Sequence, residues 1–253
     1  MALVRVNAVI QARHSSTRLP GKVLRPLAGR SVLSWVVRAA ARASGIGTVI
    51  VATSTSPDDD AVADEAASAG AEVVRGPLDD VLARYELAAR THPCDAVVRL
   101  TADCPLLDPA LIAQVVGVWL ADPELQYVSN VLVRTLPRGF DVELVRGDVL
   151  AEQYETATGA HREHVTSAIH TRPDVYRCAG VVTGGDDSDL RVTLDTTQDA
   201  ELLDAVAAEL GDGAARWRDV VALLRSRPDL VALNAEVVQK SVPTSRPTSR
   251  PTI

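Results

Sequence analysis

Three cations and three hydroxyl groups lie close together in the segment Gln11-Ala12-Arg13-His14-Ser15-Ser16-Thr17-Arg18-Leu19-Pro20-Gly21-Lys22. Arginine and lysine neutralise phosphate oxygens, while hydroxyls and backbone amides hydrogen-bond to them. The segment therefore predicts a polyphosphate-binding loop, with a solvated basic loop as the alternative. It is not a P-loop, because the GxxxxGK[ST] pattern is absent.

Charge is unevenly distributed along the chain. Residues 1–57 hold eight basic side chains and no acidic one, although the formal net charge of the whole chain is −7. Nucleic-acid binding depends on a basic face that neutralises many phosphates, so we expect no nucleic-acid partner. The basic N-terminal segment instead indicates a small anionic ligand.

Two carboxylates each follow an apolar segment that we expect to be a strand. Asp103 follows the strand expected at 95–100, and Asp195 follows the strand expected at 190–193. Ligands of open α/β sheets bind at the carboxyl ends of the strands, and Mg²⁺ is held there by one or two carboxylates together with phosphate oxygens. The pair is therefore predicted to hold Mg²⁺, although Asp103 alone equally suits a turn. Asp108 and Asp199 are predicted to stabilise helix starts instead.

A further polar group lies in Pro137-Arg138-Gly139-Phe140-Asp141-Val142-Glu143-Leu144. If residues 140–144 form a strand, Asp141 and Glu143 project from the same face. They could bind hydroxyls or an amine of a second substrate, or they could face solvent on an edge strand. His161 and His164 follow later, but without an HExxH motif they do not predict a zinc site.

Strands and helices alternate along most of the chain. We expect strands at 4–12, 48–53, 71–74, 95–100, 127–129, 140–144, 175–182 and 190–193, and helices at 31–43, 57–69, 78–90, 109–120, 148–156, 160–171, 199–210 and 215–225. This alternation is typical of a mostly parallel sheet covered by helices on both faces. The sequence therefore predicts one α/β domain over residues 1–240, followed by a disordered Pro/Ser/Thr/Arg tail over residues 241–253.

The chain has no segment of the ~20 apolar residues that a membrane span needs, and its start does not read as a signal peptide. We therefore expect a cytoplasmic protein with no membrane partner. Cys94, Cys104 and Cys178 lack the spacing of a zinc or redox site. Reduced, buried thiols are expected.

Five motifs follow one another along the chain: IQARHSSTRLPGKVL, RLTADCPLLDP, PRGFDVELV, REHVT and LRVTLDTTQDAELL. Together they resemble the spore-coat-polysaccharide type of cytidylyltransferase, a family related to the CMP-sialate and CMP-Kdo synthetases. The resemblance spans about residues 4–210. It implies a single three-layer, GT-A-like nucleotidyltransferase domain with a mostly parallel, Rossmann-like sheet, with CTP as the donor and Mg²⁺ as the cofactor.

The resemblance also implies roles for individual residues. Arg13, Ser15, Arg18 and Lys22 match the nucleotide-binding loop, and Asp103 and Asp195 match the metal-binding acids; of these, Arg13, Lys22, Asp103 and Asp195 are the predicted catalytic residues. Gln11, Ala12, Ser16, Thr101 and Ala102 complete the predicted nucleotide site at the two strand ends. The predicted acceptor site consists of Asp141, Glu143, Arg162 and His164 from the family motifs, with Arg138 as a further cation for an acidic group.

The implied reaction is attack by an acceptor oxygen on the α-phosphorus of CTP with loss of pyrophosphate. The expected acceptor is a small acidic molecule, a sugar acid or a phosphonate, that also carries hydroxyl or amino groups. A glycosyltransferase that uses a nucleotide sugar and a non-catalytic nucleotide-binding protein are the alternatives. The oligomeric state stays open, with a homodimer as one option.

Overall fold

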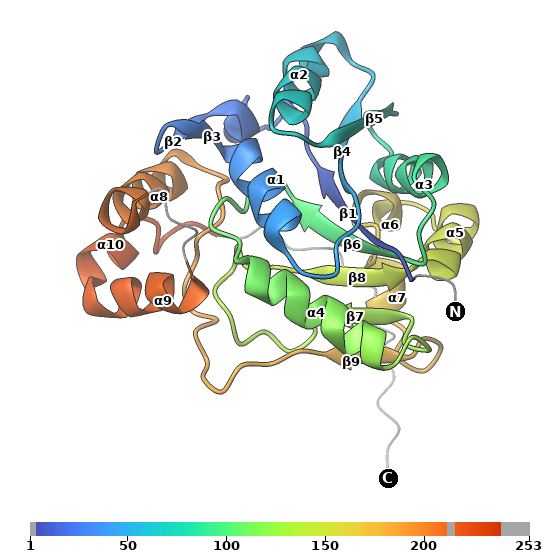
Figure 1. Ribbon diagram of the computed structural model, residues 1–253. Coiled ribbons are helices and arrows are strands. Elements are labelled where there is room, and N and C mark those ends of the chain that lie inside the picture. The colour runs from blue at the N-terminus through green and yellow to red at the C-terminus, as the bar shows by residue number, and fades with distance from the viewer. Residues whose placement is uncertain (1–3, 212–215, 239–253) are drawn as a thin grey trace.

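The computed structural model describes residues 4–211 and 216–238, which are built around a seven-stranded sheet (Figure 1). The strands of the sheet are β1 (Val6–Gln11), β4 (Val49–Ser54), β5 (Glu72–Gly76), β6 (Ala96–Thr101), β7 (Tyr127–Ser129), β8 (Glu143–Arg146) and β9 (Cys178–Gly180). Their order is β5-β4-β1-β6-β8-β7-β9, and only β8 pairs antiparallel with its neighbours. The predicted α/β class and mostly parallel sheet are confirmed.

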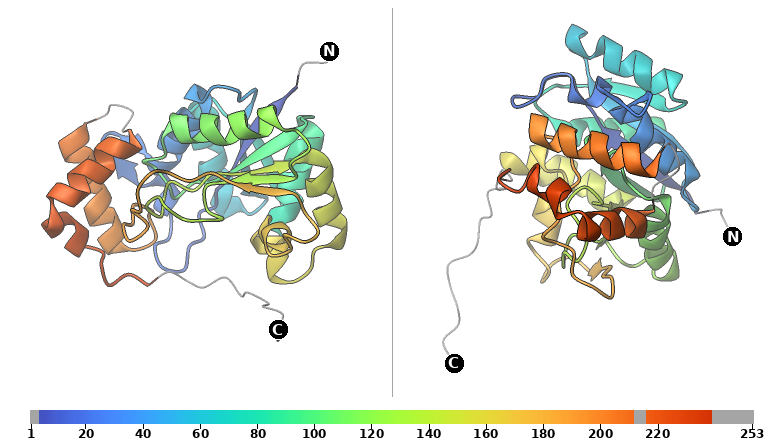
Figure 2. Two further views of the ribbon diagram at one scale, coloured as in Figure 1. Left: turned by 90° about the horizontal axis from the view of Figure 1, so that it is seen from below. Right: turned by 90° about the vertical axis from the view of Figure 1, so that its left-hand side faces the viewer.

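Helices cover both faces of the sheet and form three layers with it (Figure 2, left). One face carries α1 (Val32–Arg42), α2 (Asp60–Ser68) and α4 (Pro109–Ala121), and the other carries α3 (Val81–Thr91), α5 (Gly147–Thr156), α6 (Ala160–Glu163) and α7 (Ser167–His170). The last helices, α8 (Thr197–Leu210), α9 (Trp217–Ser226) and α10 (Pro228–Ala232), lie together beside the sheet, away from α3 and α5 (Figure 1).

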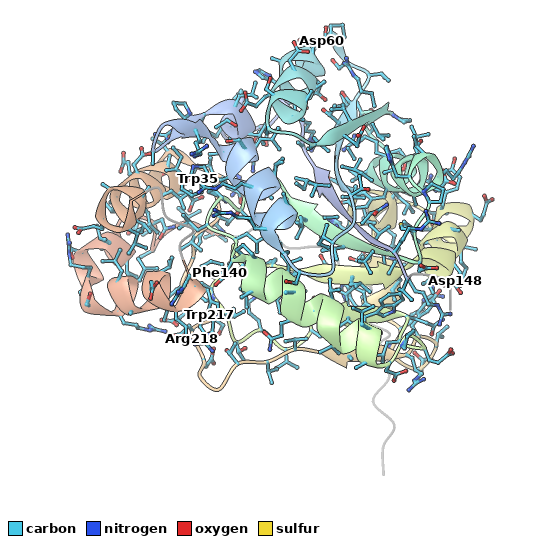
Figure 3. The ribbon with its side chains drawn as sticks, in the orientation of Figure 1. Trp35, Asp60, Phe140, Asp148, Trp217 and Arg218 are labelled. Atoms are coloured by element: carbon cyan, nitrogen blue, oxygen red, sulfur yellow. The ribbon has the colours of Figure 1, made fainter. Side chains whose placement is uncertain are left out.

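Several helices begin where the sequence predicts. The Ser31 hydroxyl accepts a hydrogen bond from the Ser34 amide at the start of α1, and the Asp108 carboxylate accepts one from the Ala110 amide at the start of α4. Asp199 belongs to a capping box at the start of α8. Side-chain oxygens satisfy amides that have no partner within the helix, which fixes these boundaries. The tryptophans expected in the core are buried: Trp35, Trp119 and Trp217, of which Figure 3 labels the first and the last.

The strand predicted at 190–193 is wrong. The segment makes one isolated bridge, in which the Arg138 amide donates to the Leu190 carbonyl at 3.0 Å and the Val192 amide donates to the Arg138 carbonyl at 2.7 Å. Gly139 follows Arg138 with a φ of 113°, which is accessible to glycine and turns the chain away. A ladder cannot extend past that turn, so a buried apolar segment remains without a strand.

The boundaries of three other elements also differ from prediction. Strand β8 begins only at Glu143, because the Asn130 side chain bonds the Phe140 carbonyl and the Val142 amide in place of a neighbouring strand. Asp141 therefore precedes the strand, and the prediction that it shares a strand face with Glu143 is wrong. The helix predicted at 160–171 is divided into α6 and α7 at Val165, which has a φ of 45°. Strand β9 covers only the middle of the range 175–182.

Short elements near the N-terminus and the last helix had no counterpart in the prediction. They are the hairpin of β2 (Pro26–Leu27) and β3 (Arg30–Ser31), the 3₁₀ helix η1 (Lys22–Leu24) and helix α10; the 3₁₀ helix η2 (Pro57–Asp59) is the first turn of the helix predicted at 57–69. The predicted tail over 241–253 lies outside the described residues. Within the described ranges, no helix is both long and apolar enough to cross a membrane. The three cysteines are free thiols, and only Cys104 is fully buried.

A buried ion pair joins β6 to β8. Arg99 on β6 contacts Glu143 on β8, and the Glu143 carboxylate also accepts hydrogen bonds from the hydroxyls of Tyr127 and Thr166. Burial alone would raise the pKa of Glu143, but Arg99 and the two hydroxyls together lower it. The ionised carboxylate therefore links three strands, β6, β7 and β8, to the break between α6 and α7.

We expect Glu143→Gln to lower the free energy of unfolding at neutral pH by about 3–5 kcal/mol, because it leaves the buried Arg99 without its counter-charge. The folded-state pKa of Glu143 lies below its unfolded value, so this stabilisation is present above the unfolded pKa and is lost as the pH falls through the folded pKa. Urea unfolding should show that the difference in free energy of unfolding between wild type and variant becomes smaller at acidic pH. The control is Asp148→Asn, which breaks an exposed pair with Arg146 on the surface of α5 (Figure 3) and should change stability by less than about 1 kcal/mol. Equal effects of the two substitutions would contradict the buried role of Glu143.

Gly139 is expected to be intolerant of any side chain. A Cβ there would lie 2.7 Å from the Val192 carbonyl carbon and 2.8 Å from the Thr193 nitrogen, whereas a Cβ at Gly70, which also has positive φ, would meet nothing within 4 Å. Gly70→Ala should therefore cost about 1–2 kcal/mol for its backbone conformation alone. Gly139→Ala should cost clearly more in the same unfolding experiment, since the 192–193 backbone must also move. A cost no larger than that of Gly70→Ala would show that the close approach is unimportant.

Candidate active site

An open cleft of about 750 Å³ lies at the carboxyl ends of β1 and β6. The two strands pair in parallel with Gln11 opposite Thr101, so their ends emerge side by side. The walls come from the loop after β1, the turn after β6 and the start of α3, with Glu163 and Asp195 added from later in the chain. Pockets of this size bind nucleotides and other small molecules.

Every residue predicted to bind the nucleotide lines this cleft. They are Gln11, Ala12, Arg13, Ser15, Ser16, Arg18, Lys22, Thr101 and Ala102, and the predicted metal ligands Asp103 and Asp195 also line it. The residues selected from two strand ends and a later acid thus come together in one cleft.

The basic loop after β1 is held at its base by hydrogen bonds. Gly21, with a φ of 69°, donates its amide to the His14 carbonyl at 2.9 Å and closes the loop. The His14 amide donates to the buried Asp59 carboxylate at 2.6 Å, and Asp59 also accepts from the Ser54 amide and hydroxyl. Burial alone would raise the pKa of Asp59, but these bonds lower it. Sequence analysis missed Asp59, because an aspartate in Ser-Pro-Asp-Asp-Asp reads only as a helix start.

Lys22 lies between the two predicted metal ligands. Its Nζ donates to Asp103 Oδ2 at 2.7 Å, to Asp195 Oδ1 at 2.8 Å and to the Leu194 carbonyl at 2.8 Å. Only 12% of the Lys22 side chain is exposed. Burial alone would lower the pKa of Lys22, but the two carboxylates raise it.

The other oxygen of Asp195 faces two arginines. Arg18 from the basic loop lies 2.8 Å from Asp195 Oδ2, and Arg191 lies 2.9 Å from the same atom. Burial opposes ionisation, but Lys22, Arg191 and Arg18 hold the pKa of Asp195 at about 2. Asp195 is therefore a carboxylate at any physiological pH.

The backbone of the Asp195 segment is attached directly to the Asp103 turn. The Leu194 amide donates to the Asp103 carbonyl at 2.8 Å, and the Thr193 hydroxyl donates to it at 3.1 Å. Asp199 fixes the other side, since it accepts from the Asp195 amide and forms an ion pair with Arg191. Asp195 thus reaches the predicted place beside Asp103 without the strand that was expected to carry it.

None of the predicted acceptor residues, Arg138, Asp141, Glu143, Arg162 and His164, lines the cleft. Glu143 is buried and occupied by Arg99, Tyr127 and Thr166. Its buried carboxylate therefore offers no oxygen to a molecule in the cleft.

Arg162 and His164 flank the one residue of the REHVT motif that reaches the cleft. Arg162 is paired with Asp80 at 2.7 Å and stacks on the Tyr154 ring, so it attaches α6 to the start of α3. Burial lowers the pKa of His164. Glu163, between them, lines the cleft and lies 3.8 Å from Arg13.

Arg138 and Asp141 lie in the segment before β8, and the Arg138 backbone pairs with residues 190–192. Asp141 forms a two-point ion pair with Arg134, at 2.7 and 2.8 Å. Half-buried Arg138 has no ion-pair partner among the described residues. The pKa of Arg138 is lowered first by burial and then by the neighbouring Arg134, while the carboxylates of Asp141 and Asp195 partly oppose this shift. Among the described residues, Arg138 is thus a cation that carboxylates influence without a direct ion pair.

Arg84 on α3 is a cleft residue that sequence analysis missed. It is 1% exposed, and its guanidinium donates to the carbonyls of Pro77 and Leu78 at 2.8 and 2.9 Å, while its Nε has no partner within the described residues. It holds the loop before α3 against the cleft. An arginine in an amphipathic helix gives no sequence signal for this role.

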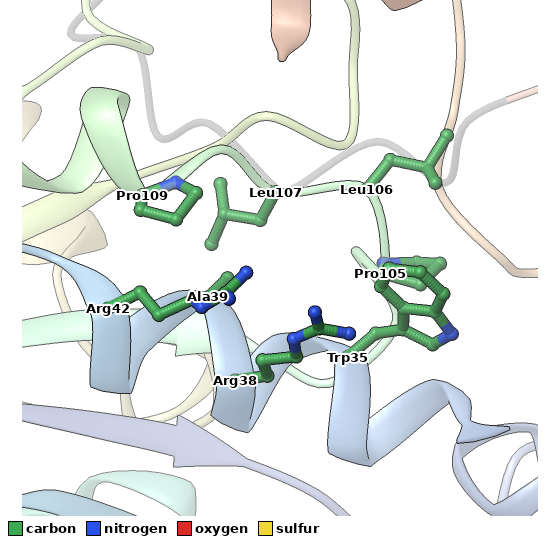
Figure 4. A pocket seen from close by; sticks show the side chains of 8 residues that line it. All are labelled: Trp35, Arg38, Ala39, Arg42, Pro105, Leu106, Leu107 and Pro109. Atoms are coloured by element: carbon green, nitrogen blue, oxygen red, sulfur yellow. The ribbon is translucent and has the colours of Figure 1, made fainter. Parts of the chain in front are cut away.

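A second, much smaller pocket lies between α1 and residues 105–109, where Arg38 and Arg42 extend over it (Figure 4). Its volume of about 20 Å³ is enough for roughly one water molecule. The large cleft is therefore the candidate site for a substrate.

Known proteins include several that are similar to this chain in sequence or fold. The chain is 29% identical over 231 residues to the spore coat polysaccharide biosynthesis protein SpsF of Bacillus subtilis, covering 87% of this chain and 94% of that protein. It is 37% identical over 125 residues to a 3-deoxy-manno-octulosonate cytidylyltransferase of Trichlorobacter lovleyi, a match that covers about half of each chain (49% and 48%). The solved structure of a cytidylyltransferase from Leptospira borgpetersenii aligns with a TM-score of 0.86 at 28% identity, over 90% of this chain and 97% of that one.

The cytidylyltransferase family profile matches residues 7–178, which contain the basic loop, Asp103 and the strands that carry them. This match covers more than half of the chain, so the chain belongs to the cytidylyltransferase family.

Proposed function

We propose that this enzyme transfers CMP from CTP to a small acceptor with an acidic group and releases pyrophosphate, with Mg²⁺ as its cofactor. The observation that carries the proposal is the convergence of Asp103 and Asp195 on one cation at the edge of a cleft with a basic loop. The match to the cytidylyltransferase family supports CTP as the nucleotide.

The chain's own contribution to this reaction is positioning and charge neutralisation. Phosphoryl transfer needs little covalent help from a protein, so groups that hold the phosphates in place account for most of the catalysis. Arg13, Arg18 and Lys22 line one wall and are suited to the departing pyrophosphate. The hydroxyls of Ser15 and Ser16 lie in the same loop and can hydrogen-bond phosphate oxygens.

The residues present fit a magnesium ion. Asp103 and Asp195 both come within hydrogen-bond distance of the Lys22 ammonium, so two carboxylate oxygens already surround one cation-sized position. Magnesium is commonly held by one or two carboxylates and takes its remaining ligands from phosphate and water, so these two acids are sufficient protein ligands. When bound, Mg²⁺ supplies charge neutralisation and polarisation at the phosphate oxygens.

The acceptor is assigned to the region next to Asp195, where Arg138 lies outside the cleft lining and pairs through its backbone with residues 190–192. Arg138 is half-buried there without an ion-pair partner among the described residues, whereas the nearby Arg134 is already neutralised by Asp141. A carboxylate or phosphonate would provide a direct counter-charge through a two-point contact. An acceptor oxygen that is already anionic needs no dedicated base.

The metal role is tested with Asp103→Asn. Pyrophosphate release from CTP is measured over a panel of sugar acids and aminophosphonates with Mg²⁺, and the variant should lose about 10²-fold or more of the turnover. The melting temperature should change little, because Lys22 keeps its contacts to Asp195 and Leu194. Asp64→Asn, an exposed change on α2, is the control for charge and should keep full turnover. Near-normal turnover of Asp103→Asn would show that Asp103 is only a turn residue, and release of a nucleoside diphosphate from a nucleotide sugar would indicate a glycosyltransferase instead.

Arg138→Gln tests the acceptor assignment. The KM for the acceptor should rise by about tenfold or more, as expected for one charge-assisted contact worth 1.5–3 kcal/mol, while the KM for CTP stays nearly constant. Arg177→Gln, which breaks an exposed pair with Asp122, serves as the control. If the KM for CTP rises instead, Arg138 acts on the nucleotide and its assignment to the acceptor is wrong.

A further inference from the structure

The Lys22 ammonium is saturated by the groups that would bind the metal. An ammonium has three N–H donors, and here they point to Asp103, Asp195 and the Leu194 carbonyl, at 2.7, 2.8 and 2.8 Å. No donor of Lys22 is left over for a phosphate. In this arrangement Lys22 acts on the two carboxylates and not on a ligand in the cleft.

The ammonium and a metal ion cannot both use these oxygens at once. Asp195 Oδ2 is taken by Arg18 and Arg191, so Oδ1 is the oxygen available to a metal, and Oδ1 is the atom that Lys22 contacts. A divalent ion bound at about 2.0–2.1 Å from the same oxygens would lie directly beside the ammonium. The two positive charges would then repel each other with nothing between them to screen the repulsion. Binding of a metal ion to the two oxygens that Lys22 contacts therefore requires the ammonium to move away from them.

A bound triphosphate offers the Lys22 ammonium an alternative set of hydrogen-bond acceptors. Lys22 begins the short helix η1 directly after Gly21, and its long, flexible side chain lines the same cleft wall as Arg13 and Arg18. Phosphate oxygens on that wall can accept all three ammonium protons in place of the carboxylates and the carbonyl. The exchange moves one positive charge from the acids to the phosphates and leaves the acids open to a cation.

We propose that Lys22 is a gate on the metal site: it closes the site in the free enzyme and opens it when the polyphosphate of the nucleotide draws it away. The inference rests on the metal site of the proposed function. Metal and nucleoside triphosphate then bind with positive coupling, and the coupling is reciprocal. Free enzyme exposed to the metal alone stays largely unloaded, so an unproductive metal-bound state is avoided.

The gate is tested by metal binding to free enzyme, with no nucleotide and no acceptor. Free Mn²⁺ is titrated by its electron paramagnetic resonance signal against wild type and Lys22→Met, and the variant should bind Mn²⁺ about tenfold or more tightly. Arg25→Met removes a nearby cation that pairs with Asp204 outside the cleft, and it should bind like wild type. The double variant Lys22→Met/Asp103→Asn should lose the added affinity. Lys22→Gln replaces Lys22→Met if the latter does not fold.

A second measurement follows the other half of the exchange. In metal-free buffer with EDTA, calorimetry should show that Lys22→Met weakens binding of CTP far more than binding of CMP. Equal loss for the two nucleotides would show that Lys22 does not move to the outer phosphates and would overturn the gate.

The possible outcomes distinguish failure of the gate from failure of the proposed metal site. Equal Mn²⁺ affinity of wild type and Lys22→Met, abolished in both by Asp103→Asn, would overturn the gate and leave the metal site in place. Absence of Mn²⁺ binding in every variant, together with normal turnover of Asp103→Asn, would overturn the proposed metal site and the gate together.

Discussion

The close contact between the turn after β6 and the segment at 193–195 determines most of the active site. The Leu194 amide and the Thr193 hydroxyl both bond to the Asp103 carbonyl, so two carboxylates distant in sequence are brought onto one ammonium. Two carboxylates that contact the same ammonium repel each other strongly in a partly buried site. Both stay ionised only because cations surround them. Lys22, Arg18 and Arg191 supply that charge. The rest of the cleft is arranged around this cluster.

The sheet provides the rigid side of the site, and irregular chain provides the rest. Parallel pairing of β1 with β6 sets the loop and Asp103 side by side through backbone hydrogen bonds alone. The loop is then fastened at Asp59, and the Asp195 segment at Asp199, in each case by a buried carboxylate that accepts backbone amides. Buried carboxylates of this kind fix a loop's position more firmly than surface pairs do, because little water competes for their hydrogen bonds.

The parts of the fold that could be predicted from sequence are those set by local pattern. Apolar periodicity located the strands around the first half of the sheet, and Ser31 and Asp108 marked helix starts, because both signals arise within a few neighbouring residues. The composition of the loop and the positions of Asp103 and Asp195 were enough to predict the cleft. Burial and pairing of polar side chains between distant segments left no local trace. Glu143 reads as an accessible acid, and only the fold reveals Arg99, Tyr127 and Thr166 around it. The strand predicted at 190–193 failed for the same reason, since its apolar residues are buried but Gly139 removes the neighbour with which it would pair.

The hydrogen bonds that hold the Asp195 segment in place have a consequence for the order in which the active site forms during synthesis. Asn234, which follows α10 and is 5% exposed, donates to the Asp199 carboxylate at 2.8 Å and to the Arg191 carbonyl at 3.2 Å. During synthesis the chain emerges N-terminus first, so the strands and the basic loop are available long before this amide. A nascent or prematurely ended chain can therefore acquire the sheet and the cationic loop while the second carboxylate is still unbraced. These two hydrogen bonds to the Asp195 segment can form only after Asn234, beyond the last described helix, has been synthesised.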